Sequence, residues 1–138
     1  MKILDANMIL RFLLKDDEKS AVIVRDIIKS ESVMVLPEII AEVVYVITRV
    51  YKYERIKTSS GIAAFLNYHN IVTEKYDVVL KALQYFGDTS LDFADCLLCA
   101  YHTVSGYEIC TFDKKLNNFY LSGWKLGSSR IGRNHAFI

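Results

Sequence analysis

The sequence predicts a single α/β domain in which helices flank a central parallel sheet. Short apolar runs that are typical of strands alternate along the chain with longer segments of helical periodicity. No repeat, linker or low-complexity tract divides the 138 residues, of which 52% are apolar and 24% charged. Strands that are separated by helices pair in parallel through right-handed crossovers.

The first elements are a short strand and two helices. Ile3 and Leu4 lead a strand that stops at Asp5, and Asn7 suits the start of a helix over residues 8–14. A second helix spans about residues 19–29. Its apolar side chains are expected on one side of that helix: Val22, Ile23, Ile27 and Ile28.

The middle of the chain contains two further strands. Residues 33–36 form an apolar strand, and Pro37 begins a long helix that continues to Val50. After a polar stretch, residues 61–68 have a helical pattern and residues 70–73 that of a strand.

Two helices and a last strand follow. Residues 76–86 and 92–104 are predicted helices, and Gly106 ends the second of them. Residues 107–112 read as a strand that ends at Asp113.

The charge of the chain is distributed unevenly, although its net value is only +1. Five of the 17 basic side chains, but none of the 16 acidic ones, lie after Asp113. If several upstream carboxylates met, their repulsion would need a cation, and a divalent metal is the usual solution. We expect residues 1–121 to form the domain and residues 122–138 a basic tail.

Cysteine usage and hydropathy favour a cytoplasmic protein. Cys96 and Cys99 have the spacing of a zinc knuckle or redox motif, but they lie in an apolar helical run with no second ligand pair. We therefore expect buried free thiols there, and Cys110 is a third, unmatched cysteine. Asp5 comes too early for a signal peptide, and no stretch approaches the roughly 20 apolar residues of a membrane span.

Three carboxylates are placed where they could meet. Asp5 and Asp113 both follow predicted strands, and the carboxyl ends of parallel strands share one edge of a sheet. Each of the two could instead be a turn or capping residue. Glu42 lies one turn into the helix after the second strand, at the expected edge of its apolar face. An unpaired carboxylate is costly there, which favours a partner or a metal.

Asp92 and Asp95 stand at the start of a predicted helix. They could form a capping box, with Asp92 as the N-cap and Asp95 as the reciprocal acid. Alternatively, Asp95 projects from the helix start toward the edge where Asp5 and Asp113 are expected.

Other chemistries are not indicated. The glycines are isolated, so there is no phosphate-binding loop and no sign of ATP chemistry. The histidines show neither metal-ligand spacing nor a nucleophile partner, and we expect surface or packing roles for all three: His69, His102 and His135.

Four segments together resemble a known family. Ile3-Leu4-Asp5-Ala6-Asn7, the segments 37–42 and 92–100, and Cys110-Thr111-Phe112-Asp113 are similar in order and approximate spacing to the four acidic motifs of PIN-domain ribonucleases. The VapC-type toxins are the most similar group. The resemblance covers about residues 1–121.

The resemblance implies a metal site of four acids: Asp5, Glu42, Asp95 and Asp113. It implies supporting polar positions at Asn7 and Thr111, with Asp92 as an additional acid. Mg²⁺ or Mn²⁺ is the implied cofactor, because hard cations prefer oxygen ligands. The implied activity is RNA cleavage that leaves a 5′-phosphate and a 3′-hydroxyl. The implied partners are a cognate antitoxin and a second copy in a homodimer.

Basic side chains near these motifs are candidate phosphate contacts, because four acids alone would repel RNA. The main candidates are Arg11, Arg49, Lys52, Arg55 and Lys114, with Lys15, Lys57 and Lys115 beside them. Tyr51 and Tyr53 are interleaved with them and could stack on bases. Any one of these cations taken alone could also be an ordinary surface charge.

Two other classes of protein compete with a ribonuclease. One is a non-catalytic PIN-like module that binds RNA or protein, against which the presence of all four acids argues. The other is a phosphoacceptor receiver-like domain. A receiver needs a second acid directly beside the first strand, whereas Asp5 is followed by Ala6 and Asn7.

Overall fold

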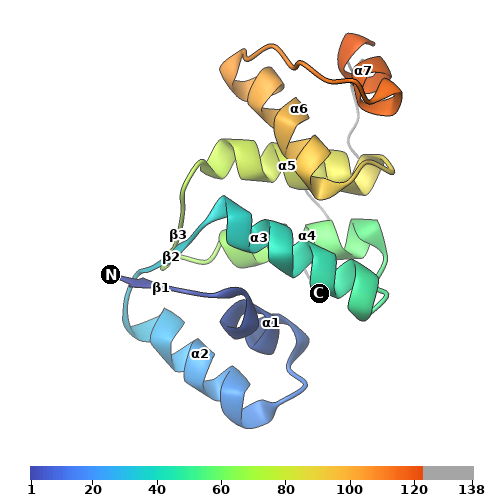
Figure 1. The fold of residues 1–138 in the computed structure, drawn as a ribbon. Coiled ribbons are helices and arrows are strands. Elements are labelled where there is room, and N and C mark those ends of the chain that lie inside the picture. Colours follow the sequence, from blue (N-terminus) through green and yellow to red (C-terminus); the bar gives the residue numbers. More distant parts are fainter. Residues whose placement is uncertain (123–138) are drawn as a thin grey trace.

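The computed structural model describes residues 1–122, and residues 123–138 of the predicted basic tail lie outside them. Three strands form one parallel sheet in the order β1 (Lys2–Ile3), β2 (Val33–Val35) and β3 (Ile71–Thr73). The strands lie together at one side of the molecule, and the helices extend away from them (Figure 1). The predicted α/β class with a parallel sheet is confirmed.

The described chain has seven α-helices, and a π-helical turn extends one of them. They are α1 (Ala6–Leu14), α2 (Glu18–Ser30), α3 (Pro37–Tyr45) with the turn η1 (Val46–Val50), α4 (Arg55–Leu66), α5 (Tyr76–Asp88), α6 (Phe93–Ser105) and α7 (Lys114–Leu121). In Figure 1, α1 and α2 lie on one side of α3, and α5 to α7 on the other. Over residues 1–122, none of these helices is both long and apolar enough to cross a membrane.

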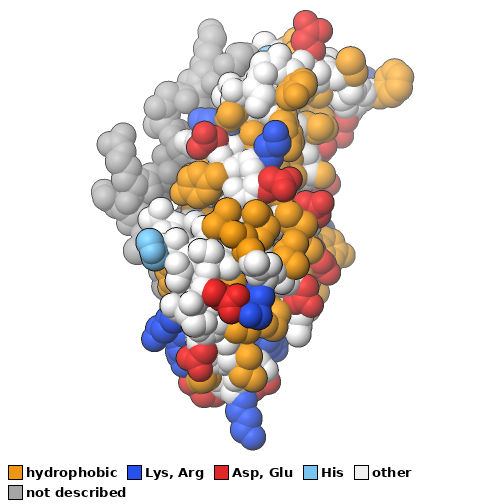
Figure 2. All heavy atoms as spheres, turned by 90° about the vertical axis from the view of Figure 1, so that its left-hand side faces the viewer, with side chains coloured by type: hydrophobic (Ala, Val, Ile, Leu, Met, Phe, Trp, Pro, Cys, Tyr) orange, Lys and Arg blue, Asp and Glu red, His pale blue; other side chains and the backbone are white. Residues whose placement is uncertain are grey.

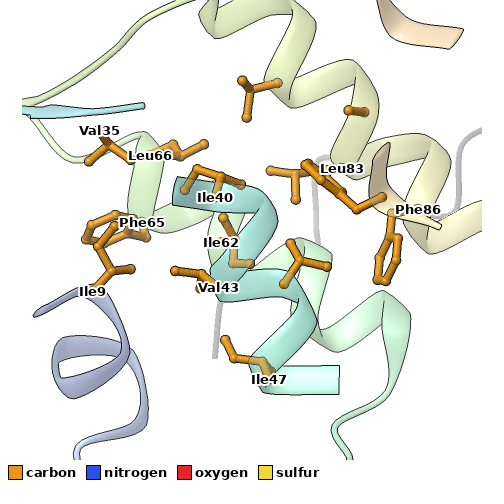
Figure 3. Packing of buried hydrophobic residues seen from close by; sticks show 14 of the residues in the cluster. Ile9, Val35, Ile40, Val43, Ile47, Ile62, Phe65, Leu66, Leu83 and Phe86 are labelled. Atoms are coloured by element: carbon orange, nitrogen blue, oxygen red, sulfur yellow. The ribbon is translucent and has the colours of Figure 1, made fainter. Parts of the chain in front are cut away.

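The core is built around α3, which is central to the molecule. Ile40, Val43 and Ile47 are fully or almost fully buried. Figure 3 shows them between Ile9 of α1 and Leu83 of α5, and the surrounding side chains come from α4 and β2. Complete burial of such side chains contributes about 1.5–3 kcal/mol each before the loss of conformational entropy is counted.

Two predicted helix boundaries are confirmed by their local chemistry. Pro37 occupies the first turn of α3, where its missing N–H costs no hydrogen bond. Gly106 ends α6 in the left-handed conformation, with φ of 78°, and its N–H donates to the carbonyl of His102.

Three details at the helices differ from the sequence-based expectation. Asp5, and not Asn7, is the N-cap of α1. Helix α2 buries Ala21, Val24 and Ile28, whereas Ile23 of the expected apolar side is 58% exposed. Helix α4 begins at Arg55, six residues before the expected start. The polar residues early in this helix are buried: Thr58, Ser59 and Ser60. The sequence pattern indicated a loop there because such residues are common in loops.

The prediction of a strand over residues 107–112 is wrong for this structure. That segment has no strand neighbour among the described residues, because α6 packs against α5 and carries the segment away from β1 (Figure 1). A strand requires a partner for its backbone groups, so a strand-like sequence alone does not form one. Helix α7, which the sequence pattern did not predict, follows directly after Asp113.

Candidate active site

Asp5 stands where β1 leads into α1 and caps that helix. One carboxylate oxygen, Oδ1, accepts a hydrogen bond from the N–H of Met8 at 2.8 Å. The side chain is exposed, as is that of the neighbouring Asn7. The capping alternative for Asp5 is therefore realised, and its second oxygen has no hydrogen bond within residues 1–122.

Glu42 lies on the outer surface of α3, which corrects its expected position at the edge of the apolar face. The inward direction of α3 is set by Ile40, Val43 and Val44. Glu42 is two residues beyond Ile40, or about 200° around the helix, and its side chain is exposed. The structure thus gives no burial that would force Glu42 to take a partner.

Asp92 and Asp95 occupy the start of α6 but do not form a capping box. Asp92 is the N-cap residue without a side-chain capping bond. Its Oδ1 lies 3.6 Å from Nη2 of Arg49, in an exposed ion pair. Burial raises the pKa of the Asp95 carboxyl, and the negative charges of Asp113 and Asp92 raise it further, while Lys115 opposes them. Two neighbouring acids, Asp113 and Asp92, therefore disfavour the charged form of the Asp95 carboxyl.

Asp113 caps α7 as Asp5 caps α1. Its Oδ1 accepts from the N–H of Leu116 at 2.9 Å, and its own N–H donates to Oγ1 of Thr111 at 3.0 Å. Thr111 thus fixes the turn that presents Asp113, and the Asp113 side chain is exposed.

The four expected metal-site acids do not meet within one chain. Asp113 lies near enough to Asp95 to raise the pKa of that carboxyl, whereas Asp5 stands at the start of α1, which lies on the other side of α3 from α6 (Figure 1), and Glu42 lies on the exposed surface of α3. Over residues 1–122, no group of three or more His, Cys, Asp or Glu lies close enough to hold a metal ion. The carboxylate oxygens of Asp95 and of its neighbours Asp92 and Asp113 are of the type that Mg²⁺ or Mn²⁺ prefers.

Two of the candidate phosphate contacts are engaged with protein groups at the surface. Arg11 pairs with Asp16 at 2.9 Å, and its Nη2 donates to the hydroxyl of Tyr51 at 3.4 Å. The hydrogen bond with that hydroxyl raises the pKa of Arg11 most, burial lowers it, and the charge of Asp16 adds a smaller rise. Arg49 carries the pair with Asp92, and its side chain is 64% exposed. Arg49 therefore remains within reach of a ligand, whereas the side chain of Arg11 is only 21% exposed.

Arg55 is turned into the protein. Its Nε donates to the carbonyl of Phe86 at 3.0 Å, one Nη2 donates to the carbonyl of Leu91, and the guanidinium lies 3.6 Å from the centre of the Phe86 ring. Burial lowers the pKa of Arg55. Arg55 therefore clamps the connection between α5 and α6, a role that sequence reasoning missed. No local pattern could have indicated it, because its partners lie 31 and 36 residues away.

Four lysines among the candidate phosphate contacts lie on the surface: Lys52, Lys57, Lys114 and Lys115. Lys52 is exposed in a left-handed turn with φ of 61°, and Lys114 is exposed at the start of α7. Lys115 donates to the carbonyl of Ser90 at 3.2 Å and thereby stands close to the start of α6. Lys57 lies 5.5 Å from the centre of the Tyr53 ring.

A cavity of about 560 Å³ lies between α3, η1 and the start of α6. Val44, Tyr45 and Phe93 line it with apolar surface, and the ion pair of Arg49 with Asp92 stands at its rim. An apolar cleft with charged groups at its rim can take an extended or helical peptide.

The cysteines behave as expected for buried thiols. Cys96 and Cys99 are free and buried, which confirms the prediction, and Cys110 is free and exposed. Burial raises the pKa of the Cys96 thiol to about 12 and that of Cys99 to about 11.

The two described histidines have packing or surface roles, as predicted. His102 is hydrogen-bonded through Nδ1 to the carbonyl of Tyr107 at 2.6 Å and its ring lies 4.5 Å from that of Tyr120. His69 is exposed, and His135 lies outside the described residues.

Comparison with known protein families gives one match. Residues 2–120 match the PIN domain, so the match spans the whole described sheet, six complete helices and all four acids of the expected metal site. No curated protein and no solved structure matches the chain.

Proposed function

Because this chain belongs to the PIN domain family, whose fold is generally that of a nuclease, we propose that it is a divalent-metal-dependent endoribonuclease. It hydrolyses RNA phosphodiester bonds with Mg²⁺ or Mn²⁺ and acts in the cytoplasm as the toxin of a toxin–antitoxin pair. The family membership is established, and the metal, the substrate and the biological role are the proposal.

The observation that carries this proposal is the environment of Asp95. A carboxylate whose pKa is raised first by burial and further by two neighbouring acids is unfavourable for a merely structural residue. Perturbed carboxylates of this kind concentrate at functional sites. A cation bound near Asp95 would relieve the repulsion that acts on this carboxylate and would favour its charged form.

RNA binding is supported by exposed cations on both sides of the acids. Arg49 and Lys52 follow the end of α3, and Lys114 stands beside Asp113. Each can contact a phosphate group, and exposed Tyr51 offers a ring for base stacking. Arg55 contributes indirectly, because its clamp on Leu91 holds the start of α6 and with it Asp95.

The antitoxin is proposed to bind the apolar cavity between α3, η1 and α6. Tyr45, which lines this cavity, is a large side chain that is 62% exposed. An antitoxin peptide that covers Tyr45 would lie against Arg49 and Asp92 and could thus obstruct access to the acids at the start of α6.

The function is tested by cleavage of a labelled RNA with the purified chain. We expect cleavage with Mg²⁺ or Mn²⁺, products with 5′-phosphate and 3′-hydroxyl ends, and no cleavage after chelation. Asp95→Asn removes the charge at nearly constant shape and should abolish cleavage, whereas Asp26→Asn on the exposed surface of α2 should not. Activity that survives in Asp95→Asn would contradict the assignment.

A non-catalytic PIN-like module is the second candidate, because the described residues of one chain bring no three acids together. Calorimetric titration with Mn²⁺ separates the two candidates. A nuclease should show divalent-ion binding that is lost in Asp95→Asn, and a scaffold should show no carboxylate-dependent binding at all.

A further inference from the structure

A basic hollow lies between α2, the end of α1 and the connection from α4 to β3. Its volume is about 490 Å³, and its buried lining residues are apolar, namely Phe12, Ala21 and Ile28. Among the described residues, no Asp or Glu lines it. The other lining side chains are polar or cationic: Lys15, Arg25, Lys29, Tyr68, His69 and Asn70. This composition fits a ligand that carries both flat apolar groups and negative charge.

Tyr68 offers an aromatic ring in this hollow. The centre of its ring lies 5.6 Å from that of Phe12, at an interplanar angle of 89°, and 6.2 Å from that of Phe65. Phe12 and Phe65 are buried, whereas Tyr68 is 48% exposed. Two buried rings therefore support the Tyr68 ring, and about half of this residue stays open to solvent. A ring that is held in this way can stack on a nucleobase.

A second hollow, of about 190 Å³, continues the first one toward the start of α4. Phe12, Lys15 and Tyr68 line both hollows, and the second one adds Tyr53 and Lys57. Lys57 places its ammonium group 5.5 Å from the centre of the Tyr53 ring, so a cation and a ring stand together here as well. No Asp or Glu of the described chain lines this hollow either.

The cavity beside α3 and η1 is the third hollow in the series, because Tyr53 lines it as well as the second one. The start of α6 contributes Asp92 to its lining, and the charge of Asp92 raises the pKa of the Asp95 carboxyl. On the opposite wall, Glu42 precedes the lining residue Tyr45 by three positions and therefore lies on the same side of α3. The three hollows thus lead from α2 to the neighbourhood of two expected metal-site acids.

We propose that the three hollows form one path for single-stranded RNA, with bases stacked on Tyr68 and Tyr53. Phosphate groups contact the cations beside these rings: Lys15, Arg25, Lys29 and Lys57. Figure 2 shows Lys and Arg side chains gathered at the lower left of the view, below a histidine, at the height of α2 in Figure 1. Binding along the path is argued from the hollows, and delivery of the strand to the acids rests on the proposed function.

A single strand fits this series better than a duplex or an acidic peptide. The bases of a duplex are paired and stacked on one another, so they would not reach the two tyrosine rings. An acidic peptide would neutralise the cations, but it would leave both rings without a flat partner. The substrate is therefore expected to contain an unpaired stretch next to the bond that is cleaved.

The first experiment measures binding of a labelled oligouridylate of about 12 nucleotides to the full chain by fluorescence anisotropy. A chelator is present throughout, so that no metal-dependent cleavage occurs. We expect Tyr68→Ala to raise the Kd about tenfold, because one base loses its stacking partner, and Tyr68→Phe to keep the wild-type Kd. Tyr76→Ala is the matched control at another exposed tyrosine, the first residue of α5, and should also keep it.

The salt dependence of the same binding tests the cations. Each phosphate contact on a single strand contributes about 0.7 to the slope of log Kd against log salt concentration. The double variant Lys15→Gln with Lys29→Gln should therefore lower this slope by about 1.4. The control double variant is Lys19→Gln with Lys75→Gln, at two exposed lysines that line none of the three hollows, and it should keep the wild-type slope.

Photo-crosslinking of the wild-type chain locates the strand without any substitution. An oligouridylate that contains 4-thiouridine is irradiated in the complex, and the crosslinked peptides are mapped by mass spectrometry. We expect crosslinks at Tyr53 and Tyr68.

Three results would overturn the path. The first is a Kd for Tyr68→Ala equal to that of the wild type. The second is a set of crosslinks that all lie outside the three hollows. The third is displacement of the RNA by its own duplex with oligoadenylate, or by oligoglutamate, as readily as by unlabelled oligouridylate.

The outcome for the path is separate from the outcome for the proposed function. A chain that binds RNA at Tyr68 but cleaves none would refute the nuclease and leave the path in place. A chain that cleaves RNA, and whose Tyr68→Ala variant keeps the wild-type KM, would refute the path and leave the nuclease in place.

Discussion

At the scale of single residues, Asp5 has two separable properties. Its shape and oxygen cap α1 through Met8, and its charge is what a metal site would use. Asparagine is about as good an N-cap as aspartate, whereas alanine cannot accept the capping hydrogen bond. Substitution at this position can therefore distinguish stability from catalysis.

We predict that Asp5→Asn leaves the free energy of unfolding within about 0.5 kcal/mol of the wild type and abolishes cleavage. Asp5→Ala should abolish cleavage and also lower the free energy of unfolding by about 1 kcal/mol. Urea denaturation and the RNA cleavage assay measure the two effects. If Asp5→Asn and Asp5→Ala lose the same amount of stability, the capping hydrogen bond contributes nothing to the free energy of unfolding.

The buried thiols give the protein a pH dependence at alkaline pH. Burial raises the pKa of Cys96 to about 12, from an ordinary value of 9.0, so the folded state favours the neutral thiol. This contribution to stability is fully present below pH 9 and is lost as the pH rises from 9 toward 12. Cys99, with its pKa raised to about 11, acts in the same direction.

We therefore predict that the free energy of unfolding falls between pH 9 and pH 11, and that it falls less steeply in Cys96→Ala. Urea denaturation at a series of pH values gives the two slopes. Cys110→Ala, at the exposed cysteine, should keep the wild-type slope. If the free energy of unfolding falls as steeply with pH in Cys96→Ala as in the wild type, groups other than Cys96 cause the loss of stability.

At the scale of elements, the connection between α5 and α6 depends on a side chain from a third helix. Arg55 begins α4 and binds two carbonyls, those of Phe86 near the end of α5 and Leu91 just before α6. The same connection carries Asp92 and leads to Asp95. The clamp thus couples the packing of three helices to the position of the acids.

We predict that Arg55→Met lowers the free energy of unfolding by about 2 kcal/mol, because the two carbonyls lose a charged donor while most of the side-chain volume is kept. Arg25→Met should change it by less than about 0.5 kcal/mol, since the ion pair of Arg25 with Glu18 is long, at 3.9 Å, and exposed. Urea denaturation compares the two. An Arg55→Met variant as stable as Arg25→Met would refute the clamp.

Elements that local chemistry determines were predictable from the sequence. The start of α3 at Pro37 and the end of α6 at Gly106 follow from backbone preferences of those residues. The strand predicted at residues 107–112 fails because a strand depends on a distant neighbour. Helix α7 was missed although two signals were usable, namely the capping Asp113 and the helical spacing of Leu116, Phe119 and Tyr120.

At the scale of the whole molecule, the acids of the candidate site were predictable in order but not in arrangement. Spacing along the chain indicated four acidic motifs, and the match to the PIN domain over residues 2–120 agrees with them. Whether the carboxylates meet depends on how α6 packs relative to β1, which no local pattern contains. The exposure of Glu42 likewise follows from which face of α3 the neighbouring helices cover.

The central claim is that the acids of this chain serve metal-dependent cleavage of RNA. Asp113→Asn tests it most directly, because it removes the charge and keeps an oxygen that can accept the capping hydrogen bond from the N–H of Leu116. With Mn²⁺, the wild type should cleave a labelled RNA and Asp113→Asn should not, although urea denaturation should give both the same free energy of unfolding within about 0.5 kcal/mol. A wild type that cleaves no RNA, or an Asp113→Asn variant as active as the wild type, would contradict the claim.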